Sequence, residues 1–429
     1  MMTFLILLIV VIAALEAPIF TIIGGLSIVC FYMVDQDFQS LQTILIEMNR
    51  LASMPVLVAL PLFTLAGCIL TETKAPNRIM NFMEALVGWL PGGLAIAGLC
   101  ACAFFTALTG ASGVTIVAVG SILYPILREK GYDEKFTLGL LTAGGSLGLL
   151  FPPSLPVILY GIVAQTDIQK IYTSALLPGV FLVVMLSIYA CIRQIRINAT
   201  PGAQAVAREP FSISNLKNTF IAGLWEWPIV AIVFIGIYGG FVTIAEVSAL
   251  ILTYIIVVEC FILKEIQFFK KMPQLVVEST VLSGSIIIIL GVALGFTGYL
   301  VDEEIPNQIL DYLTSLSDNK YLFLIALNIF LLGVGCIMDI FSAIVIVVPI
   351  IIPIALNFGI DPIHLCIIFL VNLEIGYATP PVGINLFITS LKFNKPITLL
   401  YRAAIPFVIL LLICLIVITY VPSMSLLGK

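Results

Sequence analysis

Long apolar segments, separated by short segments that hold most of the charged residues, make up the greater part of this chain. Each apolar segment contains roughly 20 residues or more, which is enough for a helix to cross about 30 Å of hydrocarbon. The first segment lacks the basic start and the small-residue cleavage site of a signal peptide, so we expect it to be retained. The pattern predicts an all-α polytopic membrane protein with spans near 3–34, 55–73, 135–166, 173–192, 222–240, 244–263, 275–300, 363–391 and 399–421.

Two further apolar segments, 92–127 and 321–356, are too long for one span and have a polar or glycine-rich centre. The first centre reads TGASG at 109–113, and the second reads GCIMDIF at 335–341. Glycine adopts the backbone conformations that a tight turn needs. We therefore expect two re-entrant helical hairpins, each entering and leaving the membrane on one side.

The charged residues predict how the chain is oriented. With the N-terminus in the cytoplasm and both hairpins re-entrant, most of the 19 lysines and arginines lie on the cytoplasmic side. The positive-inside rule favours this arrangement, which places the C-terminus outside. Residues 35–51, 77–90 and 303–318 space their apolar side chains at helical intervals with polar residues between, which predicts arm helices at the membrane surface.

The two halves of the chain match each other at a shift of 228 residues. Pro152-Pro153 then meets Pro380-Pro381, Gly148 meets Gly376, and Asp133 meets Asp361. The charge assignment gives the halves opposite directions, and an inverted-topology repeat with broken helices is typical of secondary transporters. We expect a first repeat at 1–192 (hairpin 92–127, broken helix 135–166), a cytoplasmic linker at 193–221, and a second repeat at 222–429 (hairpin 321–356, broken helix 363–391).

The Pro-Pro pairs indicate what the broken helices are for. Proline removes a backbone donor, so carbonyl groups near the pair lose their helical partners. Irregular backbone is tolerated at membrane depth only where protein or a water-filled cavity surrounds it. Free carbonyls and the hydroxyls of Ser154 and Thr379 are oxygen ligands that suit Na⁺, and the following half-helix directs its positive end at an anion. A proline kink used only for packing is the alternative, but a matched pair of Pro-Pro breaks favours a site.

The hairpin centres add further polar groups. Thr109 and Ser112 offer hydroxyls, and Gly110 and Gly113 allow a turn between them. Asp339 is a carboxylate near the middle of the second hairpin, and an acid within a membrane segment is a functional candidate by default. It could instead be a water-exposed tip residue.

Two polar residues of the second broken helix have open roles. Asn385 follows the second Pro-Pro pair and could bind substrate or make a simple hydrogen bond between helices. Glu374 precedes that pair, and both ion coupling and a structural pair remain open for it.

Composition narrows the function classes. The chain is 61% hydrophobic and only 10% charged, with a mean hydropathy of +1.19, whereas soluble proteins carry about 25% charged residues. The sequence lacks a phosphate-binding loop, which speaks against ATP-driven pumping, and His364 is its single histidine, which excludes a histidine-based metal site. The nine cysteines form no CxxC pair and fit buried hydrophobic positions. Because the predicted core lacks lysine and arginine, an anionic substrate would rely on helix ends, hydroxyls and bound cations.

Four segments together resemble one transporter family. FFTALTGASGVTIVAVGSILYP and GSLGLLFPPSLPVILYG in the first half, and MDIFSAIVIVVPIIIP and IGYATPPVGINLF in the second, are similar to the large membrane (M) subunit of tripartite ATP-independent periplasmic (TRAP) transporters, of the dicarboxylate type. The resemblance implies an elevator-type, Na⁺-driven importer of C4-dicarboxylates or related organic acids in the bacterial cell inner membrane, and no enzyme activity. It also implies a multi-pass chain with a cytoplasmic N-terminus and a periplasmic C-terminus.

The resemblance further implies partners and site residues. The partners would be a small four-helix membrane subunit (Q type), a periplasmic substrate-binding protein (P type), the lipid bilayer and a small anionic substrate, with no nucleic acid. The family's sodium sites, carried to matching positions, imply Gly110, Ser112, Gly113 and the 152–154 break, and then Asp339 and the 379–385 break. Together with the side-chain chemistry above, this predicts a first Na⁺ site at Thr109, Gly110, Ser112, Gly113, Pro152, Pro153 and Ser154, a second at Asp339, Thr379, Pro380, Pro381 and Gly383, and substrate contacts at Ser112, Ser154 and Asn385. At the first tip, GASG departs from members that carry a second serine.

Two other functions compete with this interpretation. A stand-alone Na⁺/dicarboxylate symporter of the same inverted-repeat build would work without a binding protein. An intramembrane protease would need a second acid beside Asp339, which the sequence does not offer, and no serine–histidine pair is expected near His364.

Overall fold

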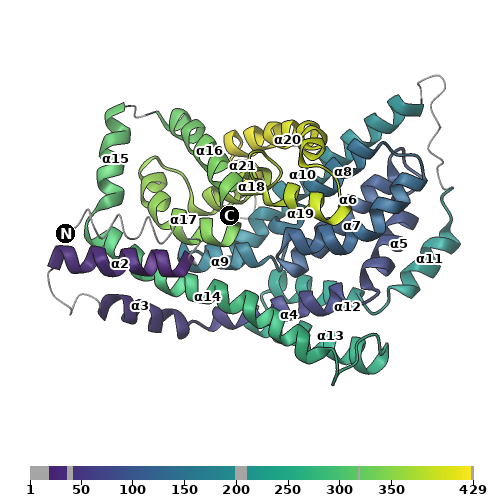
Figure 1. The fold of residues 1–429 in the computed structure, drawn as a ribbon, viewed down its shortest axis with the longest axis horizontal. Helices are drawn as coiled ribbons and strands as arrows, with labels where there is room; N and C mark the ends of the chain where they lie inside the picture. Colours follow the sequence, from purple (N-terminus) through teal and green to yellow (C-terminus); the bar gives the residue numbers. More distant parts are fainter. Residues whose placement is uncertain (1–18, 36–41, 199–209, 317–318, 427–429) are drawn as a thin grey trace.

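The computed structural model describes residues 19–35, 42–198, 210–316 and 319–426. All regular elements in these ranges are helices (Figure 1). Six are long and apolar enough to span a membrane, or up to nine if each bent pair counts as one span. The start of the predicted first span, 3–34, lies outside the described residues, and its remainder is helix α2 (Ile19–Asp35). The prediction of an all-α polytopic membrane protein is confirmed.

The first half of the chain contains an arm, a hairpin and a broken helix in succession. Its elements are α3 (Gln42–Ala52), η1 (Pro55–Val58), α4 (Ala59–Thr71), α5 (Ala75–Val87), α6 (Gly93–Thr109), α7 (Ser112–Glu129), α8 (Glu134–Gly144), η2 (Leu147–Leu150), α9 (Leu155–Val163) and α10 (Ile168–Asn198). Helices α6 and α7 form the first hairpin, and the α8–η2 segment meets α9 at a bend of 48°.

The second half repeats this succession. Its elements are α11 (Ile213–Ala222), α12 (Trp227–Val233), η3 (Phe234–Tyr238), α13 (Ile244–Ile256), η4 (Val257–Ile262), α14 (Met272–Asp302), α15 (Ile305–Leu316), α16 (Lys320–Ile337), α17 (Ile340–Asn357), α18 (Pro362–Tyr377), α19 (Ile384–Phe393), α20 (Ile397–Tyr420) and α21 (Ser423–Leu426). Helices α16 and α17 form the second hairpin, and α18 and α19 are the halves of the second broken helix. The predicted inverted-repeat architecture with two hairpins and two broken helices is confirmed.

Two segments differ in detail from the sequence expectation. The described ends of the predicted linker 193–221 are helical, because α10 continues to Asn198 and α11 begins at Ile213. The predicted span 222–240 begins later, with α12, and meets α11 at a bend of 75°. Pro228 at the start of α12 explains this boundary, because proline lacks the N–H that a continuing helix would need.

Matching acidic residues begin the two broken helices. The Asp133 side chain accepts a hydrogen bond from Phe136 N at 3.3 Å and caps α8. Asp361 accepts one from Ile363 N at 2.9 Å and caps α18. An aspartate side chain at this position satisfies a backbone donor that the first helical turn leaves free. The matched Asp pair seen in the sequence is therefore a matched pair of helix starts.

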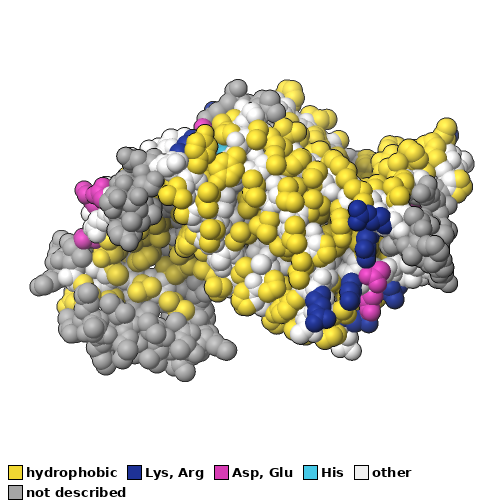
Figure 2. Space-filling model, turned by 90° about the horizontal axis from the view of Figure 1, so that it is seen from above, with side chains coloured by type: hydrophobic (Ala, Val, Ile, Leu, Met, Phe, Trp, Pro, Cys, Tyr) yellow, Lys and Arg dark blue, Asp and Glu magenta, His cyan; other side chains and the backbone are white. Residues whose placement is uncertain are grey.

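The first halves of the two broken helices, α8 and α18, lie inside the protein. Every residue of α18 from Ile363 to Tyr377 is buried, as is every residue of α8 from Phe136 to Gly144. Helix α18 packs between α16 and α20, and the long helix α14 packs against α2, α3, α4 and α17 along the edge of the molecule (Figure 1). Figure 2 shows hydrophobic side chains over most of the face seen from above, with the coloured charged groups gathered towards its ends.

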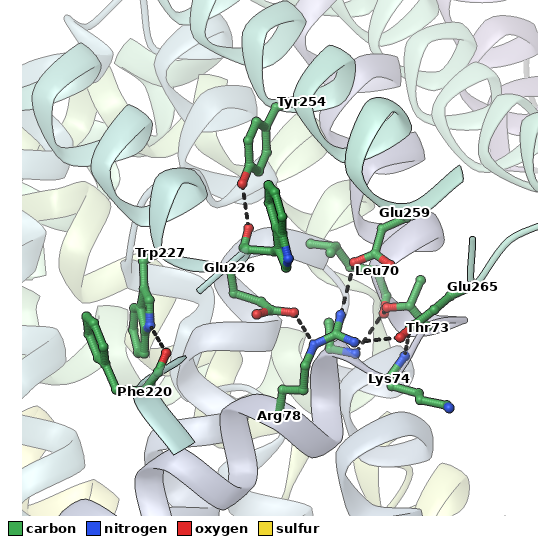
Figure 3. Close-up of polar contacts among 12 residues, drawn as sticks. Leu70, Thr73, Lys74, Arg78, Phe220, Glu226, Trp227, Tyr254, Glu259 and Glu265 are labelled. Carbon is green, nitrogen blue, oxygen red and sulfur yellow. Dashed lines mark hydrogen bonds and ion pairs between the residues drawn. The ribbon is translucent and has the colours of Figure 1, made fainter. Parts of the chain in front are cut away.

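A buried ion cluster joins the arm helix α5 to the second half of the chain (Figure 3). The Arg78 guanidinium contacts Glu226 at 2.5 Å, Glu265 at 2.6 Å and Glu259 at 3.2 Å. Burial acts to lower the pKa of Arg78, but the Glu226 carboxylate opposes this, and the pKa is raised above its ordinary value. The Lys74 backbone N–H also donates to Glu265, at 2.6 Å. One cation therefore holds three carboxylates from the segments around α12 and η4.

Replacing the central cation of this cluster tests its role in stability. We expect Arg78→Ala to lower the free energy of unfolding by about 3–5 kcal/mol, because it leaves buried carboxylates without their counter-charge. Thermal unfolding of the purified protein in detergent measures the change. Arg50→Ala is the matched control, since its pair with Glu47 lies at the surface and should contribute under about 1 kcal/mol. Equal shifts for the two variants would show that the Arg78 cluster contributes no more than a surface pair.

Candidate functional site

A cavity of about 570 Å³ lies where the two hairpin tips meet. Residues 110–113 of the first tip and 339–341 of the second both line it, together with Leu149 and Tyr377 from the two broken helices. Its volume lies in the range of small-molecule sites, roughly 300–1,000 Å³. The structure thus brings together polar segments that are more than 200 residues apart in the sequence.

The first tip is a two-residue turn that depends on glycine. Helix α6 ends at Thr109, Gly110 adopts a left-handed conformation with φ of 65°, and α7 begins at Ser112. A Cβ on Gly110 would lie 2.6 Å from Cγ of Leu155, so a larger residue would also clash with the first broken helix. The Thr109 hydroxyl lies 3.4 Å from the backbone of Ala111 and does not line the cavity.

Asn385 connects the first tip to both broken helices. Ser112 Oγ donates to Asn385 Oδ1 at 2.7 Å, and Asn385 Nδ2 donates to the Thr142 carbonyl at 3.1 Å. Ser112 and Asn385 are both buried. Asn385 therefore makes the helix–helix hydrogen bonds that were its simpler alternative, while Ser112, its donor, lines the cavity.

Asp339 directly precedes α17, the second helix of the second hairpin, and lines the cavity. Its Oδ2 accepts hydrogen bonds from Phe341 N and Ser342 N, both at 3.0 Å, and its Oδ1 accepts one from Ser342 Oγ at 2.5 Å. These contacts make Asp339 the N-cap of α17. A negative side chain at this position is also favoured by the helix dipole. The Asp339 side chain is half-buried. It is therefore less exposed than a tip residue in water, but it is not enclosed in the protein interior.

The second break packs against the end of α16. Gly383, with φ of 47°, donates its N–H to the Cys336 carbonyl at 3.1 Å, and Tyr401 donates its hydroxyl to the Pro381 carbonyl at 2.7 Å. Thr379 Oγ1 donates to the Ile375 carbonyl at 2.7 Å. Pro380 and Pro381 are exposed, and none of these residues lines the cavity.

The first break is enclosed by comparison. Pro152, Pro153 and Ser154 are all buried. The Ser154 carbonyl accepts a hydrogen bond from the Tyr172 hydroxyl at 2.8 Å, whereas its Oγ has no partner among the described residues. A buried hydroxyl without a partner is a polar atom available to a ligand. Ser154 does not line the cavity either, so the cavity directly touches only the tip members of the predicted set, Gly110, Ser112, Gly113 and Asp339.

The structure adds site residues that the sequence reasoning missed. Tyr377 accepts a hydrogen bond from Ile340 N at 2.5 Å, which ties the second tip to α18. Thr106 donates to the Gly145 carbonyl at 2.8 Å and lies 2.9 Å from the Thr115 hydroxyl, which ties the first hairpin to α8. The available signal was a hydroxyl inside an otherwise apolar run, but such residues also occur in ordinary membrane helices.

The cavity combines two positive helix ends with apolar walls. Helices α7 and α17 both begin at it, so their positive dipole ends lie beside the space, but the first N–H groups of α17 are already bonded to Asp339 and Tyr377. The described residues that line it include neither lysine nor arginine, while Phe341, Ile384 and Ile388 form apolar wall. This arrangement can hold a small molecule with an anionic group and an apolar or neutral body.

Comparisons with known proteins agree over nearly the whole chain. The family model for the tripartite ATP-independent periplasmic transporter, DctM component, matches residues 5–424. The C4-dicarboxylate TRAP transporter large permease protein DctM of Pseudomonas aeruginosa is 35% identical over 405 residues, covering 94% of this chain and 92% of that protein. The isethionate TRAP transporter permease protein DctMQ of Oleidesulfovibrio alaskensis is 34% identical over 382 residues, covering 88% of this chain and 58% of that protein.

A solved structure shares the fold. The crystal structure of the Alcanivorax borkumensis YdaH transporter, described as having an unusual topology, matches with a TM-score of 0.63 at 14% identity. The match covers 92% of this chain and 90% of that one. At this identity the likeness concerns the arrangement of helices alone.

The hydrogen bond between the first tip and the second broken helix can be tested by a double-mutant cycle. We expect Ser112→Ala and Asn385→Ala to be coupled by about 0.5–1.5 kcal/mol, because each variant removes the same buried hydrogen bond. Unfolding midpoints of the wild type, both single variants and the double variant give the coupling energy. Ser112→Ala combined with Ser285→Ala, an exposed serine of α14, should be additive. Additivity in both cycles would contradict the contact.

Proposed function

Because the chain belongs to the DctM family of tripartite ATP-independent periplasmic transporters, we propose that it carries a small organic anion across the bacterial inner membrane as the large permease subunit. One observation supports this most directly: both hairpin tips and both broken helices border one cavity. C4-dicarboxylates are the first candidates, since the Pseudomonas aeruginosa relative is named for them. Isethionate, in the name of the second relative, is also a small organic anion.

The anion would be held by helix ends rather than by a basic side chain. The N-terminal turn of α7 offers backbone N–H groups, and the Ser112 hydroxyl lies at its start. Helix α17 contributes its positive dipole end, since its first N–H groups are bonded to Tyr377 and Asp339. Asp339 opposes an anion unless its own charge is offset. The site therefore favours an anion that binds together with a cation.

Na⁺ coupling would meet this need, and the residues fit such an ion at two places. Near the first break, the buried Ser154 Oγ is without a partner among the described residues and is a neutral oxygen ligand. At the second tip, Asp339 presents a carboxylate to the cavity, close to the second break through the Gly383–Cys336 hydrogen bond. The predicted first Na⁺ site (Thr109, Gly110, Ser112, Gly113, Pro152, Pro153, Ser154) and second Na⁺ site (Asp339, Thr379, Pro380, Pro381, Gly383) remain proposals, as do substrate contacts at Ser112, Ser154 and Asn385.

We further propose a conformational state for this chain from the position of the cavity. It reaches Thr71 and Glu72 at the end of α4, where the charge assignment places the cytoplasm. The proposed state is therefore inward-facing, with an N-terminus in the cytoplasm. In an elevator-type movement, the hairpins and broken helices would slide against α4, α13 and α14 to expose the same tips to the other side.

The family also suggests partners for this chain. We propose a small membrane subunit and a periplasmic substrate-binding protein, which would deliver the anion. A stand-alone Na⁺/dicarboxylate symporter is the alternative. Uptake into proteoliposomes with and without the cognate binding protein separates the two, because the stand-alone symporter would transport free substrate at the same rate in both.

The proposed Na⁺ ligands can be tested through the sodium dependence of uptake. We expect Ser154→Ala and Asp339→Asn each to raise the Na⁺ concentration for half-maximal uptake by roughly tenfold or more, a loss of about 1.4 kcal/mol in binding. Both changes nearly preserve side-chain volume, so folded protein should remain. Uptake of a labelled C4-dicarboxylate by the complete transporter at varied Na⁺ is the measurement.

Ser285→Ala provides the control, since it removes an exposed hydroxyl that bonds only within its own helix. Its sodium dependence should equal that of the wild type. If both site variants also keep wild-type sodium dependence, the assignment of these residues to Na⁺ is wrong, whereas sodium-independent uptake by the wild type would reject Na⁺ coupling itself.

A further inference from the structure

Glu374 is a buried acid that the proposed anion and sodium sites do not use. It lies on α18, one turn before the second break, and is 1% exposed. Neither of its carboxyl oxygens has a hydrogen-bond partner among the described residues. The buried acids Glu226 and Glu259 differ, because each contacts the Arg78 guanidinium.

The surroundings of Glu374 offer no counter-charge within the described part of the chain. Helix α18 packs against α9, η2, α10, α16, α17, α19, α20 and α21. None of their titratable groups forms a hydrogen bond or an ion pair with the Glu374 carboxyl group among the described residues. The charged residues of these elements lie near helix ends (Lys170, Arg193, Arg196, Lys320, Lys392 and Arg402), and Asp339 is engaged in capping α17.

The other titratable side chains nearby have partners of their own. Tyr160 donates to the Pro362 carbonyl, Tyr172 to the Ser154 carbonyl, and Tyr377 accepts from Ile340 N. On α18 itself, His364 Nε2 contacts the Thr419 carbonyl near the outer end. None of these contacts reaches the Glu374 carboxyl group.

Physical chemistry limits the forms that such a side chain can take. An ionised carboxylate without a partner in an apolar interior costs many kcal/mol, so the group either binds a proton or pairs with a cation. Na⁺ requires several oxygen ligands at once. No oxygen atom among the described residues makes a hydrogen bond to the Glu374 carboxyl group, so the structure shows no ligand shell around it. A proton needs no such shell.

We propose that Glu374 is a proton-binding site, a neutral carboxylic acid in this conformation, that is separate from the sodium sites. It gives up its proton when movement of the second broken helix admits water to it: the O–H bond breaks, the proton passes to water, and a hydrated carboxylate remains. The site belongs to one half of the repeat, because Ser146 occupies the equivalent position in the first half and is also fully buried.

Tight packing beside Glu374 explains why water enters only when the helices move. A Cβ on Gly376 would lie 2.5 Å from the backbone of Gly335, so α16 and α18 touch at this level. Gly335 itself faces Leu373, the residue before Glu374. The second break, with exposed Pro380 and Pro381, begins one turn further along. If the second hairpin and the second broken helix separate, the contact between α16 and α18 opens and the surroundings of Glu374 change.

Infrared spectroscopy of the purified full-length chain, with any subunit that co-purifies, tests the protonation state directly. We expect the carbonyl stretching band of a buried carboxylic acid at neutral pH, shifted by deuteration, lost in Glu374→Gln and kept in Glu129→Gln. Glu129 is an exposed glutamate at the end of α7 and serves as the matched control. If the Glu374→Gln spectrum differs from the wild-type spectrum by the loss of a carboxylate band, and not of an acid band, the proposal is overturned.

A second variant covers the case in which Glu374→Gln does not fold. Glu374→Asp keeps the carboxyl group on a shorter side chain and should shift the frequency of the same acid band without removing it. If every acid band is unchanged in folded Glu374→Asp, the proposal fails.

Uptake by the complete transporter supplies a separate readout. The ratio of wild-type rates at alkaline and neutral pH should fall below one, because proton loss leaves a charge in the closed interior. Glu374→Gln should bring this ratio close to one, and Glu129→Gln should leave it at the wild-type value. A Glu374→Gln profile that follows the wild type would overturn a role in the transport cycle. Absence of uptake by the wild type at every pH would instead contradict the proposed transport function and leave the infrared result unaffected.

Discussion

The requirement that every backbone polar group be satisfied inside a membrane governs this structure. Two helices are interrupted by Pro-Pro pairs at membrane depth, and each interruption frees backbone groups that lipid cannot satisfy. The molecule meets the requirement with hydrogen bonds from neighbouring helices. The Tyr172 hydroxyl of α10 binds the Ser154 carbonyl at the buried first break, and the Cys336 carbonyl of α16 binds Gly383 N–H at the second. At the second break, where Pro380 and Pro381 are exposed, the Tyr401 hydroxyl binds the Pro381 carbonyl.

The repeat is symmetric in backbone and asymmetric in side chains. Asp339 corresponds to Ala111, Ser154 to Val382, Asn385 to Val157, and Glu374 to Ser146. The hydrogen bond from Ser112 to Asn385 joins the first hairpin to the second broken helix, so the polar groups of one half complete those of the other. The two matched backbones therefore carry different side-chain chemistry on the two sides of one site.

The sequence predicted the parts of this structure that depend on local pattern. Apolar length located the spans, the glycine-rich and acidic centres located the hairpin tips, and the Pro-Pro pairs located both breaks. Partner choices between distant helices could not be predicted, because a threonine such as Thr142 looks the same in the sequence whether its hydroxyl bonds only its own helix or also Thr389 of another helix. The Arg78 cluster could not be predicted for the same reason, since its three carboxylates lie 148 or more residues away from Arg78 in the sequence.

These contacts also determine where a movement of the hairpins would be absorbed. Arg78 holds α5 to the segments around α12 and η4, whereas α6, which follows α5, belongs to the first hairpin. The connection between them contains Gly88, Gly92 and Gly93, and Gly92 has a φ of 76°. A Cβ on Gly93 would lie 2.2 Å from the Val87 carbonyl, so the chain folds back tightly on itself here. Residues 88–93 therefore connect an arm held by charge to a hairpin that lines the cavity, and any movement of the hairpin relative to that arm would require changed backbone angles in this tight turn.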